Sequence, residues 1–236
     1  MSDTAILIDD LSIKYVTNAE GTGWRREHRT VPALRGVSAN IAHGEALGLI
    51  GHNGSGKSTL MQAIAGLLPP SSGRVLVASQ PQLLGVQAAL SVALSGHRNI
   101  ELCGLALGFS PDEIREVRDG VAAFTELGTA LDRPVRTYSV GMRQRLSFAI
   151  SALARPKILL IDEALAVGDH RFKAKCHAIL NELRSEASTV VLASHSMPEI
   201  RRTCTRVIWL DHGEIRLAGD PGEVTEQYVE QMERHS

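Results

Sequence analysis

The sequence predicts an α/β fold in which a mainly parallel sheet carries an inserted helical segment, and three observations support this. An apolar run over residues 46–50 predicts a buried strand, which leads through a glycine-rich loop into a helical stretch over residues 59–65. Three later apolar runs predict short βα-like units: Ile158–Ile161, Thr189–Ala193 and Val207–Leu210. Between the glycine-rich loop with its helix and these later runs, residues 97–153 have a helical pattern. Strands that alternate with helices favour an α/β core.

The remaining elements follow from local signals. Apolar residues alternate over residues 5–50, which predicts antiparallel β structure, interrupted by a polar loop from Asn18 to Arg29. Ser110 followed by proline and two acids predicts one helix start, and Ser139 predicts another. After Ser139 the apolar residues fall on one helical face: Met142, Leu146, Ala149, Ile150 and Leu153. Residues 221–231 predict a surface helix.

Composition limits the possible functions. The 236 residues carry 25 Lys and Arg against 26 Asp and Glu, and this balance argues against a nucleic-acid partner. Aromatic residues make up 4% of the chain, too few for a base-stacking platform. The three cysteines, Cys103, Cys176 and Cys204, show neither a disulfide framework nor metal-ligand spacing, so reduced thiols are expected.

The lack of a secretion signal predicts a cytoplasmic protein. The N-terminus has no basic segment followed by a long apolar run, so we expect no secretion signal. Residues 75–96 contain no formally charged side chain, which raises the question of a membrane span. Several serines, glutamines and a proline interrupt them, so we expect a strand and then an uncharged surface segment suited to docking on a membrane protein.

A phosphate-binding loop is the strongest functional motif. Residues 51–58 fit the pattern G-x-x-x-x-G-K-[ST] between a strand and a helix, which is the context a P-loop requires. The glycines let successive N–H groups point at one centre, and the helix N-terminus favours an anion there. Lys57 is expected to reach the β- and γ-phosphates, and the Ser58 hydroxyl to ligate Mg²⁺. The predicted nucleotide-binding residues of this loop are Gly51, His52, Asn53, Gly54, Ser55, Gly56, Lys57, Ser58 and Thr59.

Two carboxylates end the predicted strand over residues 158–161. Functional sites in open parallel sheets lie beyond the carboxyl ends of the strands. Asp162 is therefore expected to hold the hydrated Mg²⁺, and Glu163 to polarise an attacking water.

The stretch Tyr138-Ser139-Val140-Gly141-Met142-Arg143-Gln144-Arg145, opening a helix just before Asp162-Glu163, resembles the L-S-G-G-Q-Q-Q-R motif of the ABC ATPases. Asp169 follows where that family has its D-loop, and His195 matches its switch histidine. Tyr15 stands where an aromatic side chain stacks on adenine. The resemblance covers essentially the whole chain. It implies one domain, residues 1–236, with a RecA-like P-loop NTPase core (1–96 and 154–236), an antiparallel β subdomain and an inserted α-helical subdomain (97–153).

The resemblance also implies ATP and Mg²⁺ as ligands and a head-to-tail homodimer. Ser139 of one chain would cap the γ-phosphate held by Lys57 of the other, with Glu163 and His195 as catalytic residues. The motif residues acting across the dimer would be Tyr138, Ser139, Val140, Gly141 and Met142. Three of them depart from the family pattern, with Tyr138 for Leu, Val140 for the first Gly and Met142 for Gln.

The tract over residues 162–169 and the run over 208–215 are similar to polysaccharide exporters of the Wzt/KpsT/TagH-like group. This resemblance implies ATP-driven export of a lipid-linked cell-surface polysaccharide, such as an O-antigen or teichoic acid. The cargo would pass through a separate membrane permease present in two copies, with this chain on the cytoplasmic side of the membrane. Gln87 is the nearest candidate for the family's Q-loop, with a role at the metal. We expect no C-terminal carbohydrate-binding domain.

Other readings remain open. The chain could serve a different ABC transporter, a drug exporter or an importer. An ABC protein acting on DNA or ribosomes would carry coiled coils or a second ATPase domain, and a GTPase would carry an N-K-x-D motif; neither is present. The Trp24–Arg29 segment could touch lipid or cargo, or be a solvated loop. His52, His170 and His177 show no metal-ligand spacing, and His212 is expected in a hairpin turn and not as a ligand.

Overall fold

The computed structural model describes residues 3–19, 27–84, 90–153, 156–162 and 170–234. The chain forms two compact units. Unit 1 comprises Met1–Pro81, Leu160–Glu163 and Ser188–Ser236, and unit 2 comprises Gln82–Leu159 and Ala164–Ala187. The division into a core and a helical subdomain at residues 97 and 153 stays a prediction.

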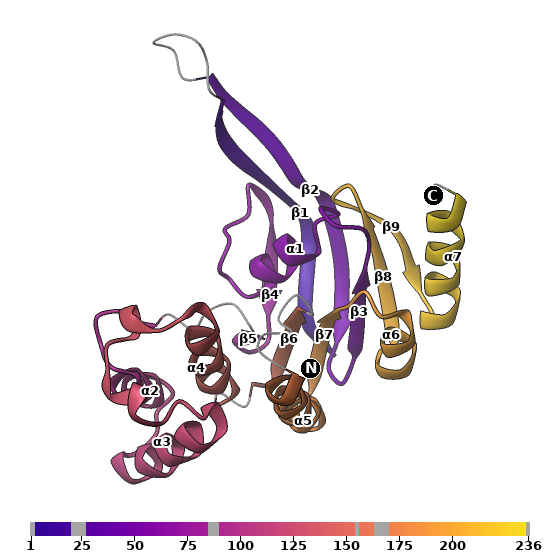
Figure 1. Ribbon diagram of the computed structural model, residues 1–236. Coiled ribbons are helices and arrows are strands. Elements are labelled where there is room, and N and C mark those ends of the chain that lie inside the picture. Colours follow the sequence, from indigo (N-terminus) through magenta and orange to yellow (C-terminus); the bar gives the residue numbers. More distant parts are fainter. Residues whose placement is uncertain (1–2, 20–26, 85–89, 154–155, 163–169, 235–236) are drawn as a thin grey trace. The chain divides into compact units, whose positions relative to one another are not determined.

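Unit 1 holds most of the strands (Figure 1). Its elements are β1 (Thr4–Ala19), β2 (Glu27–Ala42), β3 (Ala46–Ile50), α1 (Lys57–Ile64), β4 (Ser72–Val77), β7 (Thr189–Ala193), α6 (Met197–Thr203), β8 (Arg206–Asp211), β9 (Glu214–Gly219) and α7 (Pro221–Arg234). The strand β6 (Ile158–Asp162) ends in this unit.

The predicted antiparallel structure is a three-stranded sheet with the order β2-β1-β4. Ile8 lies opposite Ala39 on one side and Val75 on the other. The buried apolar residues of β1 include Ile6, Ile8, Leu11 and Ile13. The prediction of a loop from Asn18 to Arg29 is wrong at both ends. Asn18 and Ala19 still pair with residues 27 and 28, because backbone pairing continues along the ribbon past the apolar pattern (Figure 1).

The larger sheet has the order β5-β6-β7-β3-β8-β9, where β5 is Pro81–Leu84. The strand β3 is central and pairs in parallel with β7 and β8, so that Gly48 lies between Leu192 and Val207. All three strands are nearly continuous apolar runs, as expected for strands buried on both faces. The third predicted βα-like unit differs from the prediction, because β8 turns at His212-Gly213 into the antiparallel strand β9.

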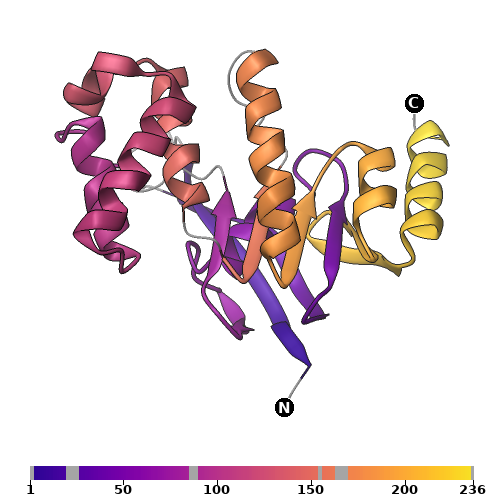
Figure 2. The same ribbon diagram turned by 90° about the horizontal axis from the view of Figure 1, so that it is seen from below.

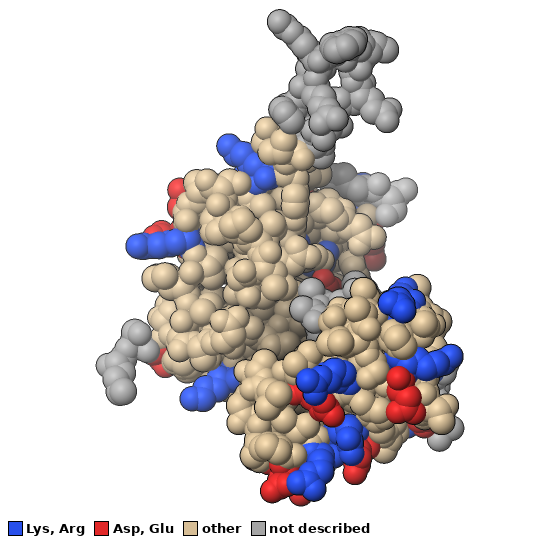
Figure 3. Space-filling model, turned by 90° about the vertical axis from the view of Figure 1, so that its left-hand side faces the viewer, with Lys and Arg blue, Asp and Glu red and all other residues tan. Residues whose placement is uncertain are grey.

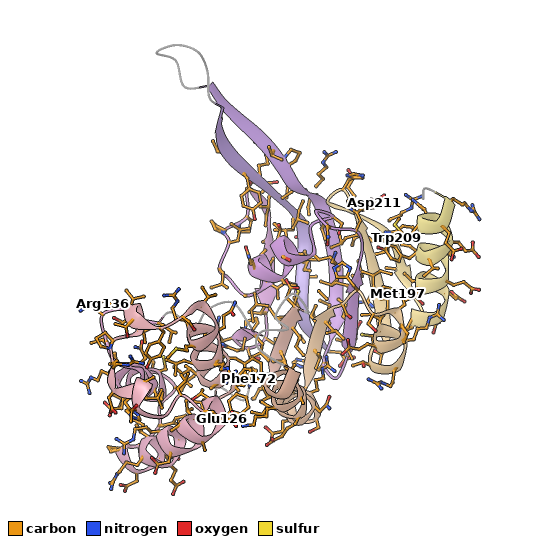
Figure 4. All side chains as sticks on the ribbon, viewed as in Figure 1. Glu126, Arg136, Phe172, Met197, Trp209 and Asp211 are labelled. Carbon is orange, nitrogen blue, oxygen red and sulfur yellow. The ribbon has the colours of Figure 1, made fainter. Side chains whose placement is uncertain are left out.

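The helix α7 contacts β8, on which Trp209 lies (Figure 4). The Trp209 and Tyr228 rings meet edge to face with centroids 5.3 Å apart. Figure 2 shows α6 and α7 side by side on this part of unit 1. The predicted surface helix over residues 221–231 is therefore confirmed and extends to Arg234.

Unit 2 is mainly helical (Figure 2). Its helices are α2 (Gly96–Ala106), α3 (Pro111–Thr125), α4 (Val140–Ala152) and α5 (His170–Glu186), with two short 3₁₀ turns, Gly128–Asp132 and Val135–Thr137. Both predicted helix starts are confirmed. Ser110 and Glu113 form a reciprocal capping box at α3, and Ser139 caps α4. The cluster that α2, α3 and α4 bury includes Ile100, Val121, Leu146 and Ile150.

No described helix is long and apolar enough to cross a membrane. In the lower part of the face in Figure 3, basic and acidic side chains are interspersed, in keeping with the balanced composition.

Candidate nucleotide-binding site

The loop between β3 and α1 has a backbone that only glycine can adopt at two points. Gly51 has a φ of 148°, and a Cβ there would lie 2.3 Å from the Leu210 carbonyl oxygen. Gly56 has a φ of 110°, and a Cβ there would lie 2.8 Å from Leu34. Gly56 also caps α1 without any side chain, so the first N–H groups of this helix are left for a ligand. The loop is therefore shaped as an anion cradle.

Lys57 is the charged centre of this loop. Its side chain is 9% exposed, and Nζ donates to the carbonyl oxygens of Gly51 at 2.6 Å and His52 at 3.0 Å. Burial lowers the pKa of Lys57, while the nearby Asp162 carboxylate raises it by a smaller amount. The cation is thus held inside the loop by backbone oxygens that a phosphate group can replace.

Ser58 and Asp162, predicted from separate motifs, lie together in unit 1. The Ser58 hydroxyl donates to Asp162 Oδ2 at 2.8 Å, although 104 residues separate them. Ser58 is in the first turn of α1 and Asp162 is the last residue of β6. A hydroxyl and a carboxylate at this distance offer the oxygen ligands that Mg²⁺ prefers, so these residues fit the ion.

Tyr15 lies at the P-loop helix. Its side chain is 40% exposed, and its hydroxyl is 3.4 Å from Thr59 Oγ1. The ring is therefore both accessible and close to the loop, as an adenine-stacking role requires; that role stays a prediction.

His195 lies just beyond the end of β7, and Gly51 lies directly after the end of β3. These two strands are parallel neighbours, so their carboxyl ends lie at the same edge of the sheet. The residue before it, Ser194, is buried, and its hydroxyl bonds to Glu199 and to the Ser196 amide. This anchored turn leaves the His195 side chain exposed at that edge.

Three predicted residues, Gln87, Glu163 and Asp169, lie outside the described residues, as do Trp24, Arg25 and Arg26. Their roles stay predictions.

The helix α4 presents the second predicted anion site, which belongs to unit 2. Ser139 is exposed, and its hydroxyl accepts from the Met142 amide at 3.2 Å. Val140 is 60% exposed, and a Cβ on Gly141 would meet nothing within 4 Å, so the helix start is open. Ser139, Gly141 and Met142 line a pocket together with two arginines, Arg133 and Arg145, and one carboxylate, Glu126. Sequence reasoning singled out neither arginine for binding; their placement beside Ser139 depends on how the chain folds.

Tyr138 has a structural place. It is 4% exposed, and its hydroxyl donates to the Ala130 carbonyl oxygen at 2.6 Å. This bond satisfies the phenol inside the cluster, which explains how Tyr stands where the motif has Leu. Burial also raises the pKa of Tyr138.

Comparison with known proteins decides the family. The ABC transporter family model matches residues 34–166, which include the P-loop, the α4 motif and Asp162. This chain belongs to the ABC transporter family. Among solved structures, the fold matches a dimeric ATP-binding cassette in a post-hydrolysis state bound to ADP and Pi. Its TM-score is 0.70, its sequence identity is 23%, and the match covers 92% of this chain and 98% of that one.

Curated relatives of this ABC protein include the teichoic acids export ATP-binding protein TagH of Shouchella clausii (strain KSM-K16). It is 42% identical over 204 residues, covering 86% of this chain and 57% of the relative. The O-antigen export system ATP-binding protein RfbB of Myxococcus xanthus is 41% identical over 206 residues, covering 87% of this chain and 47% of the relative. The chain thus spans about half the length of the curated relatives it matches.

Proposed function

We propose that this chain is the ATP-binding and ATP-hydrolysing subunit of an ABC exporter that moves a lipid-linked cell-surface polysaccharide across the cytoplasmic membrane. The observation that carries the ATPase part is the Ser58–Asp162 hydrogen bond beside the buried Lys57. The names of the relatives, teichoic acids export and O-antigen export, support the cargo class.

The described residues suit the binding of ATP. Lys57 exchanges its two carbonyl partners for the β- and γ-phosphates, and the uncapped start of α1 directs N–H groups at them. Ser58 and Asp162 hold Mg²⁺, which when bound neutralises phosphate charge. Tyr15 stacks on the adenine. Phosphoryl transfer depends mainly on such positioning and charge stabilisation.

Hydrolysis needs two further residues. Glu163 orients and deprotonates the attacking water, and His195 contacts the γ-phosphate from the end of the neighbouring strand β7. The exposed position of His195 at the carboxyl edge of the sheet supports this role.

The second half of the pocket comes from another copy of the chain. Ser139 and Gly141 form an open helix start in unit 2, whereas Lys57 belongs to unit 1. A head-to-tail homodimer places Ser139 of one copy against the γ-phosphate held by the other. ATP then stabilises the dimer, and hydrolysis releases it. Two copies of a membrane permease complete the exporter, with this subunit peripheral on the cytoplasmic side.

Transport in proteoliposomes tests the cargo. The chain is reconstituted with its permease, and ATP-dependent movement of a lipid-linked polysaccharide is measured beside movement of drug-like amphiphiles. Glycan transport that stops in a Lys57→Ala subunit supports the proposal. Drug movement without glycan movement contradicts the cargo and leaves the ATPase assignment standing.

A further inference from the structure

A cluster of two histidines and an aspartate lies where the P-loop meets the turn between β8 and β9. His52 is the second residue of the P-loop, Asp211 ends β8 (Figure 4) and His212 is in the turn. His52 Nε2 is 3.1 Å from Asp211 Oδ1, and His212 Nε2 is 3.7 Å from the same oxygen. Ligand atoms from all three residues lie within 4.8 Å of one another.

The hydrogen bonds of His52 leave two acceptors facing each other. Its Nδ1 is 2.7 Å from the Asn53 carbonyl oxygen, and because a carbonyl only accepts, Nδ1 carries the proton. A neutral ring then has a lone pair on Nε2, which points at the Asp211 carboxylate oxygen 3.1 Å away. Two acceptors at hydrogen-bond distance repel unless a cation lies between them. That cation is either a second proton on the ring or a metal ion.

The arrangement also suits the second of these. A histidine that binds a metal usually donates its other ring N–H to a carbonyl or carboxylate, as His52 does. Zinc–ligand bonds of about 2.0–2.1 Å at tetrahedral angles place neighbouring ligand atoms about 3.3 Å apart. The separations of the two histidine Nε2 atoms from Asp211 Oδ1, 3.1 and 3.7 Å, lie on either side of this value.

The scaffold holds these three residues in place. The Gly213 amide donates to the Ser55 carbonyl oxygen at 2.9 Å, which ties the turn to the P-loop. Arg216 donates to Asp211 Oδ2 at 3.0 Å, so the carboxylate presents Oδ1 alone to the histidines. The arginine charge also weakens the attraction for a cation, so the histidines must supply much of the binding. The His212 side chain is 79% exposed, which gives an ion access from solvent.

We propose that His52, Asp211 and His212 bind a divalent transition-metal ion of the zinc class, at a site separate from the Mg²⁺ site at Ser58 and Asp162. Two imidazoles and a carboxylate suit zinc, whereas Mg²⁺ takes oxygen ligands. The ion links the P-loop to the β8–β9 turn. The His52 carbonyl oxygen accepts a hydrogen bond from Lys57 Nζ. The bound ion therefore also holds in place one of the two carbonyl groups that contact this lysine.

The chain offers a conservative variant and a matched control. His212 has a φ of 48°, a conformation that Asn adopts readily, so His212→Asn removes the imidazole and keeps the turn. His97 is also a partly exposed histidine beside an aspartate, 3.7 Å from Asp132, and lies outside the cluster, so His97→Asn controls for loss of a surface histidine.

The test uses the full chain without nucleotide, since ATP chelates metal ions, in buffer with millimolar Mg²⁺. Zn²⁺ binding is measured by calorimetry, and Co²⁺ is added as a spectroscopic probe of tetrahedral coordination. We expect one Zn²⁺ per chain and a Co²⁺ visible band in the wild type and in His97→Asn. In His212→Asn we expect Zn²⁺ affinity to fall at least about tenfold and the band to disappear.

Two results overturn the proposal. One is equal Zn²⁺ affinity in the wild type and in His212→Asn. The other is an absence of Zn²⁺ binding together with NMR spectra that show His52 protonated on both ring nitrogens, which would make the proton the cation of the cluster. ATP affinity and thermal unfolding of His212→Asn, measured without zinc, are expected to match the wild type and show that the variant is folded.

Discussion

At the scale of single residues, the site depends on contacts between side chains that lie far apart in the sequence. Ser58 and Asp162 each lie in a motif with its own local context, so the sequence predicted a magnesium role for both, and the structure joins them by a hydrogen bond. His52 and His212 were not predictable as a pair, because 160 residues separate them and only the pairing of β3 with β8 brings them together. Tyr138 stands inside a recognisable motif, and its hydrogen bond to Ala130 requires the folded cluster.

Lys57→Ala is expected to weaken ATP binding. The lysine makes charge-assisted hydrogen bonds to phosphate, and loss of such bonds costs about 1.5–3 kcal/mol, or roughly a tenfold to hundredfold loss of affinity. Titration with a fluorescent ATP analogue measures this, with the unfolding temperature as a control for folding. Unchanged affinity would count against the P-loop assignment.

Glu163→Gln is expected to keep ATP binding and nearly stop turnover. The amide keeps the shape of the carboxylate and loses its ability to accept the water's proton. Loss of a general base lowers the rate by about a hundred- to ten-thousand-fold. Phosphate release under saturating ATP measures turnover, with ATP affinity determined on the same preparation. A rate equal to the wild type would remove Glu163 from the proposed mechanism.

At the scale of elements, helix starts were predictable because capping is a local pattern. Ser110 and Ser139 each cap the helix that the sequence indicated. Strand ends were less predictable. The ribbon of β1 and β2 continues through polar residues whose pairing comes from the neighbouring strand, and β9 is an alternating strand of mixed exposure that the apolar-run criterion passed over. Cross-strand pairing, which no local window contains, decides both cases.

Ser110→Ala is expected to destabilise α3 in a pH-dependent way. The variant loses the capping box, and a loss of about 1 kcal/mol lowers the melting temperature of a chain of this size by about 2–4 °C. The Ser110 side chain is the main cause of the lowered pKa of Glu113. A carboxyl with a lowered pKa stabilises the fold above the pKa it has when unfolded, and this contribution is lost as pH falls through its lowered pKa.

The difference in melting temperature between wild type and Ser110→Ala should therefore be largest near neutral pH and shrink in acid. Thermal unfolding followed by circular dichroism at several pH values measures it. Ser110→Asn, which can still cap a helix, is the matched control and should recover most of the difference. A difference that grows in acid would contradict the role of the Glu113 carboxylate.

At the scale of the whole molecule, the sequence predicts a site shared by two chains, which the structure of a single chain does not contain. The P-loop residues belong to unit 1 and the α4 motif to unit 2. A composite site between two copies stays a prediction that rests on the family resemblance, since nothing in composition or periodicity points to a partner chain. What the structure adds is that both halves are open: α1 starts without a side-chain cap, and α4 starts with Val140 exposed and free space at Gly141.

Ser139→Arg is expected to abolish the ATP-dependent dimer. A long cationic side chain at this open helix start would fill the space that the γ-phosphate and the facing copy of the chain require. The measurement is sedimentation velocity with ATP in the Glu163→Gln background, where slow turnover lets the dimer accumulate. Ser110→Arg in the same background is the matched control, because it also replaces a helix-capping serine of unit 2 but lies outside the α4 motif. We expect this control to dimerise with ATP and the Ser139→Arg variant to stay monomeric. Equal dimerisation of the two would show that α4 does not face the nucleotide of a second copy, and the composite site would have to be abandoned.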